Sequence, residues 1–138
     1  MARAGGLRRL TASEHQIQCA FMDLVRRHRP QHRDLKFLRA FPNGGLRPFQ
    51  INSKGKRYSI VAQRMHAEGV EPGPLDIILP TRRGDRVGFW FEFKVPGKRM
   101  TPEQMEYASY LAGQGWLTGT WFDAETAFSE VLKYLNND

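Results

Sequence analysis

The stretch LDIILPTRRGDRVGFWFEFKV, from Leu75 to Val95, decides the fold. Both of its ends are rich in β-branched or aromatic residues, and a segment with proline, glycine and aspartate at 80–85 separates them. Apolar runs that are separated by turn residues are typical of two strands joined by a loop. The stretch therefore predicts a β-hairpin with strands over residues 75–80 and 88–95.

Three charged side chains interrupt these apolar strands. Side chains alternate between the two faces of a strand, so Glu92 and Lys94 share a face with Trp90, and Asp76 lies in the neighbouring strand. An unpaired carboxylate or ammonium group is costly to bury, so these groups need partners. One explanation is an ion pair of Lys94 with Asp76 or Glu92. The other is a site in which the two acids offer oxygen ligands to Mg²⁺ or Mn²⁺ and Lys94 holds or activates a water beside a phosphate.

Four motifs follow one another along the chain: FPNGG at 41–45, AEGVEPGPLD at 67–76, FEFK at 91–94 and TPEQ at 101–104. In this order they resemble the VRR-NUC family of PD-(D/E)XK nucleases, which are small proteins of phages and bacteria and domains of larger repair nucleases. The resemblance covers the chain from about Glu14 to Leu135. The family usually has proline directly before the aspartate, whereas this sequence has Leu75 there and Pro74 one place earlier.

The resemblance implies an α/β fold with a restriction-endonuclease-like, PD-(D/E)XK core, in which a mixed β-sheet is flanked by helices. It implies that Asp76, Glu92 and the backbone carbonyl of Phe93 bind Mg²⁺ or Mn²⁺. It also implies that Lys94 is catalytic and positions the water that attacks the phosphate.

Glu14 and Gln104 each have two explanations. Thr11 with Glu14, and Thr101 with Gln104, fit capping boxes at the starts of two predicted helices. Glu14 also lies two helical turns before Phe21, on the apolar face of its helix. The resemblance implies that both side chains accompany the catalytic residues, with Glu14 as a further candidate metal ligand. Both alternatives stay open at this point.

Periodicity and turn residues predict the remaining elements. An edge strand is expected at 35–38, a third central strand at 116–122, and helices at 11–28, 58–68, 102 onward and 123–136. The helix at 58–68 is expected to bury a stripe made of Tyr58, Val61, Ala62 and Met65.

Charge is distributed unevenly along the chain. Residues 1–64 contain 14 Lys and Arg against 3 acidic residues, whereas residues 65–138 contain 7 against 11. A basic half beside an acidic half indicates a polyanion partner on one side and a cation-binding centre on the other, although ordinary solvation is the alternative. The candidate DNA-binding residues are Asn43, Gly44, Arg47, Lys54, Lys56, Arg57, Arg64, Lys98 and Arg99.

Length and composition set the organisation of the 138 residues. We expect a flexible basic arm over residues 1–10 and a single VRR-NUC-like nuclease domain over residues 11–138. The chain has no long apolar run and no signal-peptide core, and Cys19 is its only cysteine. These features predict a cytoplasmic protein of a bacterium or a phage-infected cell, with no membrane partner.

The combined prediction is a metal-dependent DNA endonuclease. The resemblance implies a homodimer that cuts branched DNA, such as four-way (Holliday) junctions, and leaves 5′ phosphates. One alternative is a nuclease for flaps, nicks or plain duplex. The other is a module of the same fold that binds DNA without cutting it.

Overall fold

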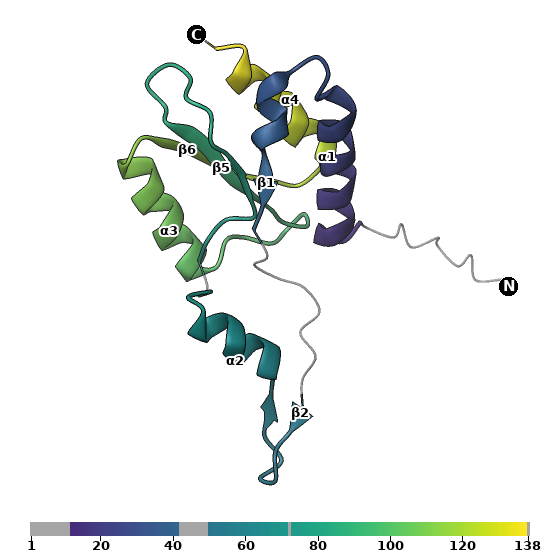
Figure 1. Ribbon diagram of the computed structural model, residues 1–138, viewed down its shortest axis with the longest axis vertical. Helices are drawn as coiled ribbons and strands as arrows, with labels where there is room; N and C mark the ends of the chain where they lie inside the picture. Colours follow the sequence, from purple (N-terminus) through teal and green to yellow (C-terminus); the bar gives the residue numbers. More distant parts are fainter. Residues whose placement is uncertain (1–11, 42–49, 72, 138) are drawn as a thin grey trace, which may run out of the picture.

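The computed structural model describes residues 12–41, 50–71 and 73–137 (Figure 1). In chain order the elements are α1 (Glu14–His28), the 3₁₀ helix η1 (Arg33–Phe37), β1 (Arg39–Ala40), β2 (Gln50–Ile51), β3 (Arg57–Tyr58), α2 (Ile60–Ala67), β4 (Ile77–Leu79), β5 (Gly88–Phe93), α3 (Pro102–Gly113), β6 (Trp116–Trp121) and α4 (Ala124–Leu135). Among the described helices, none combines the length and the apolar character that crossing a membrane requires.

A mixed sheet of four strands forms the centre, in the order β1-β4-β5-β6. The predicted hairpin is its middle, because β4 and β5 pair antiparallel with Ile77 opposite Phe91. β6 pairs parallel with β5, and α3 makes the crossover between them. Helices α1 and α4 cover one face of the sheet and α3 covers the other (Figure 1). A mixed sheet flanked by helices confirms the predicted fold class.

β5 is buried along its whole length, and its two faces belong to two apolar clusters. Its phenylalanines pack under α1, where Phe21 meets Phe91 and Phe93 edge-on at centroid distances of 5.5 and 5.3 Å. On the opposite face Trp90 packs with α3, and its indole N–H donates to the Leu75 carbonyl oxygen at 2.9 Å. The predicted alternation of β5 is therefore confirmed, and it puts Glu92 on the Trp90 side.

An arm made of β2, β3 and α2 extends away from this body (Figure 1). Among the described residues, β2 and β3 pair only with each other. The turn between them is held by Asn52, whose Oδ1 accepts from the backbone N–H groups of Lys54 and Lys56 at 3.0 and 2.8 Å. α2 ends at Ala67, and Gly69 just beyond it has φ +95° and terminates the helix as predicted. The N–H groups of Gly69 and Val70 donate to the carbonyl oxygens of His66 and Met65, which forms a Schellman motif. α2 buries none of its residues.

Three local predictions are wrong. Residues 35–38 end a 3₁₀ helix instead of forming the edge strand, because Leu35 and Leu38, three apart, both reach the core, and three residues make one 3₁₀ turn. The edge strand is shifted to 39–40. α1 begins at Glu14, and its capping box joins Ser13 to Gln16. The stripe of α2 is not buried, since the helix lies on the projecting arm and Val61 is 44% exposed.

Gly88 at the start of β5 is predicted to be irreplaceable. A Cβ added there would collide with the ring of Trp116, lying 2.9 Å from its Cε3, and would lie 3.0 Å from the Leu79 carbonyl oxygen. We expect Gly88→Ala to destabilise the protein by about 2–3 kcal/mol in urea denaturation, as overpacking does. Gly113→Ala is the matched control, because nothing lies within 4 Å of its added Cβ. Equal free energies of unfolding for the two variants would contradict this.

Candidate active site

Asp76 lies directly before β4 and is fixed against two neighbouring segments. Its Oδ2 accepts from the backbone N–H of Phe93 at 3.1 Å, which ties the carboxylate to the end of β5. Its carbonyl oxygen accepts from the backbone N–H of Phe41 at 2.7 Å. Phe41 was not singled out from the sequence, although it opens the FPNGG motif. The backbone before β4 is therefore held in place although Leu75 stands where the family usually has proline.

Glu92 is fully buried at 0% exposure. Neither of its carboxylate oxygens has a hydrogen-bond partner among the described residues. Burial raises the pKa of Glu92 from its ordinary 4.5 to about 7, against the opposing effect of Lys94. The negative charges of Asp76 and Glu14 contribute to this rise, and the side chain of Gln104 opposes it.

Four of the predicted catalytic residues lie in or next to four different elements, and each affects the ionisation of the fifth, Glu92. Glu14 is the first residue of α1, Asp76 precedes β4, Lys94 follows β5 and Gln104 lies in the first turn of α3. Each of them shifts the pKa of Glu92, which indicates that these four side chains lie near its carboxylate. The Lys94 backbone N–H donates to the Trp121 carbonyl oxygen at 3.0 Å, which continues the strand geometry past Phe93 and keeps Lys94 on the Glu92 side.

Gln104 is both a capping residue and a neighbour of the buried acid. Its Oε1 accepts from the Thr101 backbone N–H at 3.0 Å, and its own N–H donates to Thr101 Oγ1 at 3.2 Å, which confirms the predicted capping box. The cap uses the amide oxygen, so the amide nitrogen is available to Glu92. Glu14 has no part in the capping box of α1, and a cap therefore does not explain its position beside Glu92.

The side chains at this end of the sheet fit a hard divalent cation. Within the described ranges, no three His, Cys, Asp or Glu side chains form a ready-made metal cluster. Mg²⁺, however, commonly binds through only one or two carboxylates and keeps several waters. A buried carboxylate without a hydrogen-bond partner, beside a second carboxylate, matches that requirement, because a cation would compensate the burial of Glu92.

The predicted DNA-binding residues fall into separate groups. The arm carries Lys54, Lys56 and Arg57 on its hairpin and Arg64 on α2, all exposed. Lys98 and Arg99 lie exposed in the turn that follows Lys94, close in the chain to the buried acid. The structure thus separates an arm group from a group beside the site. Asn43, Gly44 and Arg47 lie outside the described residues.

Comparison with known proteins supports the fold implied by the motifs. No family model matches the sequence, and no curated protein matches it. A solved structure described as "VRR_NUC domain protein" superposes with a TM-score of 0.69 and 21% identity, covering 91% of this chain and 89% of that chain. The likeness extends over nearly the whole chain, and it confirms the PD-(D/E)XK fold that the resemblance to VRR-NUC nucleases predicts.

Proposed function

We propose that this protein is a divalent-metal-dependent deoxyribonuclease that hydrolyses phosphodiester bonds at the site formed by Asp76, Glu92 and Lys94. The observation that carries this proposal is the fully buried Glu92 carboxylate, which has no hydrogen-bond partner in the described part of the chain. Buried side-chain polar atoms usually have such partners, so an acid in this state points to a ligand. The fold likeness to a VRR_NUC domain protein supports the same conclusion.

Asp76 and Glu92 would hold Mg²⁺ or Mn²⁺, joined by the backbone carbonyl of Phe93, and Glu14 is a further candidate ligand. When bound, the cation supplies a Lewis acid that polarises the phosphate and lowers the pKa of a bound water. The N–H of Phe93 fixes the orientation of the Asp76 carboxylate before any substrate arrives. No reorganisation of that carboxylate is then needed during the reaction.

Lys94 would act on the water and on the phosphate. Lys94 is half-buried on the Glu92 side of the chain, and its positive charge lowers the pKa of the acid. Low local polarity strengthens its interaction with a phosphate oxygen beyond the value in water. Lys94 therefore orients the attacking water and offsets the negative charge that develops on the phosphate.

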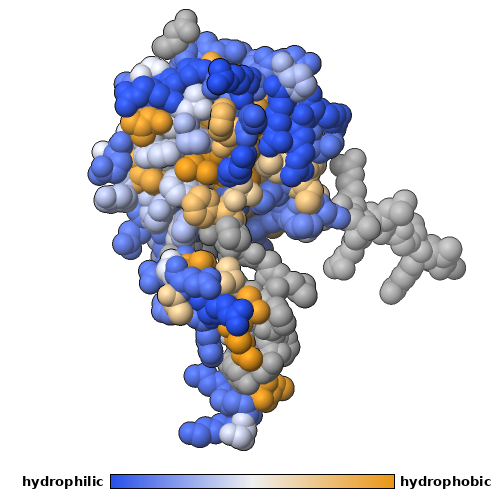
Figure 2. All heavy atoms as spheres, in the orientation of Figure 1, coloured by the Kyte–Doolittle hydropathy of each residue, from blue (hydrophilic) through white to orange (hydrophobic). Residues whose placement is uncertain are grey.

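The preferred substrate in this proposal is branched DNA, cut by a homodimer. Two sites related by a two-fold axis suit a four-way junction, which has similar symmetry. The arm offers a surface that a second copy would cover, because Ile51, Ile60 and Val61 are 66%, 49% and 44% exposed there. Figure 2 shows hydrophobic side chains among hydrophilic ones on the arm.

The test uses labelled DNA of one sequence in four forms: a four-way junction, a flap, a nicked duplex and an intact duplex. Each form is incubated with Mg²⁺, with Mn²⁺ and with EDTA, and the molar mass of the protein is measured in the same buffer. We expect cleavage with either metal, none with EDTA, and the fastest cleavage at the junction by a dimer. Equal rates on all forms would instead indicate a general nuclease. Binding without cleavage in any metal would contradict the proposed activity.

The dual position of Gln104 gives a separate prediction. Gln104→Glu keeps an oxygen for the Thr101 N–H but replaces the amide beside Glu92 with a negative charge. We expect the free energy of unfolding to stay within about 1 kcal/mol of wild type, and cleavage to fall at least ~10-fold, as for changes around metal ligands. Thr101→Ala is the control, and it should cost about 1 kcal/mol of stability while preserving cleavage. Wild-type cleavage by Gln104→Glu would make Gln104 a cap only.

A further inference from the structure

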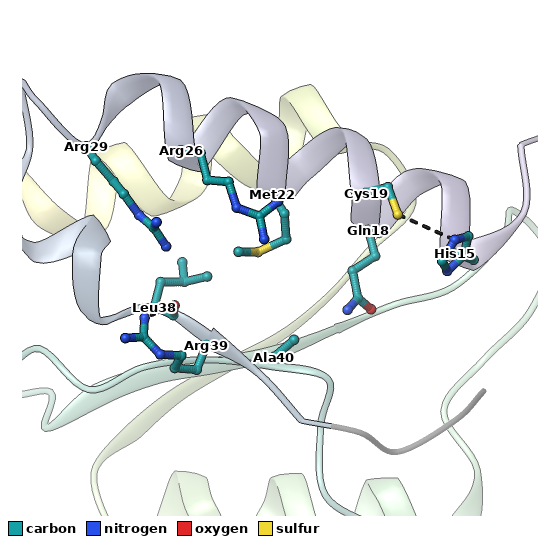
Figure 3. A pocket seen from close by; sticks show the side chains of 9 residues that line it. All are labelled: His15, Gln18, Cys19, Met22, Arg26, Arg29, Leu38, Arg39 and Ala40. Carbon is teal, nitrogen blue, oxygen red and sulfur yellow. Dashed lines mark hydrogen bonds between the residues drawn. The ribbon is translucent and has the colours of Figure 1, made fainter.

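A groove of about 510 Å³ lies between α1 and the edge strand β1 (Figure 3). Figure 3 shows side chains of α1, among them Met22 and Arg26, pointing toward β1, with Leu38 and Arg39 on the opposite wall. The groove is separate from the buried acid, which lies on the other face of the sheet with Trp90. Nothing in the motifs pointed to it.

Three arginines gather at one end of this groove: Arg26, Arg29 and Arg39 (Figure 3). In the described ranges none of them forms an ion pair with a carboxylate, whereas the adjacent Arg27 pairs with Asp23 at 2.5 Å. Backbone carbonyls orient two of the three guanidinium groups. Arg39 Nη1 donates to the carbonyl oxygens of Lys36 and Leu38 at 2.6 and 2.9 Å, and Arg29 Nε donates to that of Leu35 at 3.4 Å. Oriented cations without a counter-ion are suited to binding anions such as phosphate.

Both walls of the groove start at the candidate active site. On one wall His15 directly follows Glu14, which acts on Glu92. On the other wall Ala40 directly precedes Phe41, whose N–H donates to the Asp76 carbonyl oxygen. With a rise of about 1.5 Å per helical residue, Arg26 lies ~18 Å along α1 from Glu14. A stacked nucleic-acid strand advances about 3.4 Å per nucleotide, so this length corresponds to about five nucleotides.

We propose that the groove binds the sugar–phosphate backbone of the DNA strand that leads away from the cleavage site. The three arginines contact phosphates about five nucleotides from the scissile bond, and Met22 and Leu38 form an apolar floor beneath the sugars. The inference rests on the proposed nuclease function and adds the path of one substrate strand. Contacts of this kind position the DNA and do not read its sequence.

Arg26→Gln is the test variant, and Arg27→Gln is its matched control. The Arg26 side chain makes no hydrogen bond or ion pair with the described residues, so its replacement removes a groove charge without breaking such a bond. We expect the dissociation constant for DNA to rise about eightfold at 0.1 M salt, and the salt slope to fall by about 0.9, which is the effect of one lost phosphate contact. Arg27→Gln removes the same charge one residue away. It should leave the dissociation constant within about twofold of wild type and the salt slope nearly unchanged. Cleavage at saturating DNA should stay at the wild-type rate in Arg27→Gln.

Substrate length provides the second arm of the experiment. If the strand follows the groove, DNA trimmed to fewer than about five nucleotides on the relevant side cannot reach Arg26. Wild type and Arg26→Gln should then bind trimmed DNA equally, while they differ on full-length DNA. A difference that persists on trimmed DNA would overturn the proposed path.

The outcomes separate the groove from the nuclease function. If wild type cuts DNA and Arg26→Gln binds it as Arg27→Gln does, the groove proposal is overturned and the nuclease function stands. If wild type neither binds nor cuts DNA, both fail. Titration with inorganic phosphate covers a third case. If Arg26→Gln loses phosphate binding but keeps the wild-type affinity for DNA, the groove is a site for small anions, and the proposal is overturned.

Discussion

Replacing Glu92 by glutamine should abolish DNA cleavage and, at the same time, make the metal-free protein more stable at pH 8. Glutamine keeps the shape of the side chain but cannot hold a divalent cation with a full negative charge, so we expect cleavage to fall by about 10³-fold. The stability gain follows from burial, which raises the pKa of Glu92 to about 7. A rise in this pKa from 4.5 to about 7 means that ionised Glu92 destabilises the folded protein by about 3 kcal/mol.

The direction of the pH dependence follows from proton binding. Between pH 4.5 and about 7 the folded protein holds the Glu92 proton more tightly than the unfolded chain does. The stability that this tighter proton binding gives the folded protein is fully present below pH 4.5. It is lost as the pH rises through about 7, and it changes little above that. Urea denaturation in EDTA should therefore show wild type losing up to about 3 kcal/mol relative to Glu92→Gln between pH 5 and pH 8.

Glu106→Gln is the matched control for this prediction. Glu106 is exposed on α3, so its replacement should change neither the cleavage rate nor the pH dependence of stability. Two results would contradict the assignment of Glu92. The first is cleavage by Glu92→Gln at the wild-type rate, and the second is a lower stability of this variant than of wild type at pH 8 in EDTA.

Lys94→Ala should remove cleavage and leave DNA binding nearly intact. The proposed function places the Lys94 charge at the reacting centre, where loss of a positioned charge typically lowers the rate by 10²–10³-fold (about 3–4 kcal/mol). The basic side chains of the arm and of the turn after Lys94 remain, so the dissociation constant for DNA should change by no more than about threefold. Single-turnover cleavage with Mg²⁺ measures the first effect, and fluorescence anisotropy in EDTA measures the second.

Lys98→Ala separates a catalytic charge from a merely basic one. Lys98 is exposed four residues after Lys94 and carries the same charge. Its replacement should weaken DNA binding modestly and preserve the cleavage rate at saturating DNA. If Lys94→Ala cut DNA at the wild-type rate, or if both lysine variants lost cleavage equally, Lys94 would not have the role proposed for it.

Local patterns predicted the centre of the fold and much of the candidate site. The alternation that separates Trp90 and Glu92 from the phenylalanines of β5 depends only on strand geometry, and the structure confirms it. The capping box of Thr101 and Gln104 is equally local and is also confirmed. The proximity of Glu14 to Glu92, by contrast, came from the resemblance to a family, since no local pattern relates residues so far apart in the chain.

The incorrect predictions involve contacts that local patterns do not contain. Periodicity in α2 predicted a buried stripe, but whether a stripe is buried depends on where the helix lies, and α2 lies on an arm away from the core. Residues 35–38 carry two leucines three apart, which would point to opposite faces of a strand but share one face of a 3₁₀ turn. The arginine groove was missed because it joins Arg26 of α1 to Arg39 of the edge strand, which was predicted at the wrong residues.

Binding of Mn²⁺, followed by isothermal titration calorimetry, tests the proposed metal site most directly. Wild-type protein should bind Mn²⁺ at pH 8, and at pH 6 the binding should be weaker and accompanied by proton release, because Glu92 must lose its proton to become a ligand. Glu92→Gln and Asp76→Asn should each lose this binding, and Glu106→Gln should retain it. Mn²⁺ binding that is unchanged in Glu92→Gln, or that is absent from the wild-type protein, would contradict a metal centre at this end of the sheet.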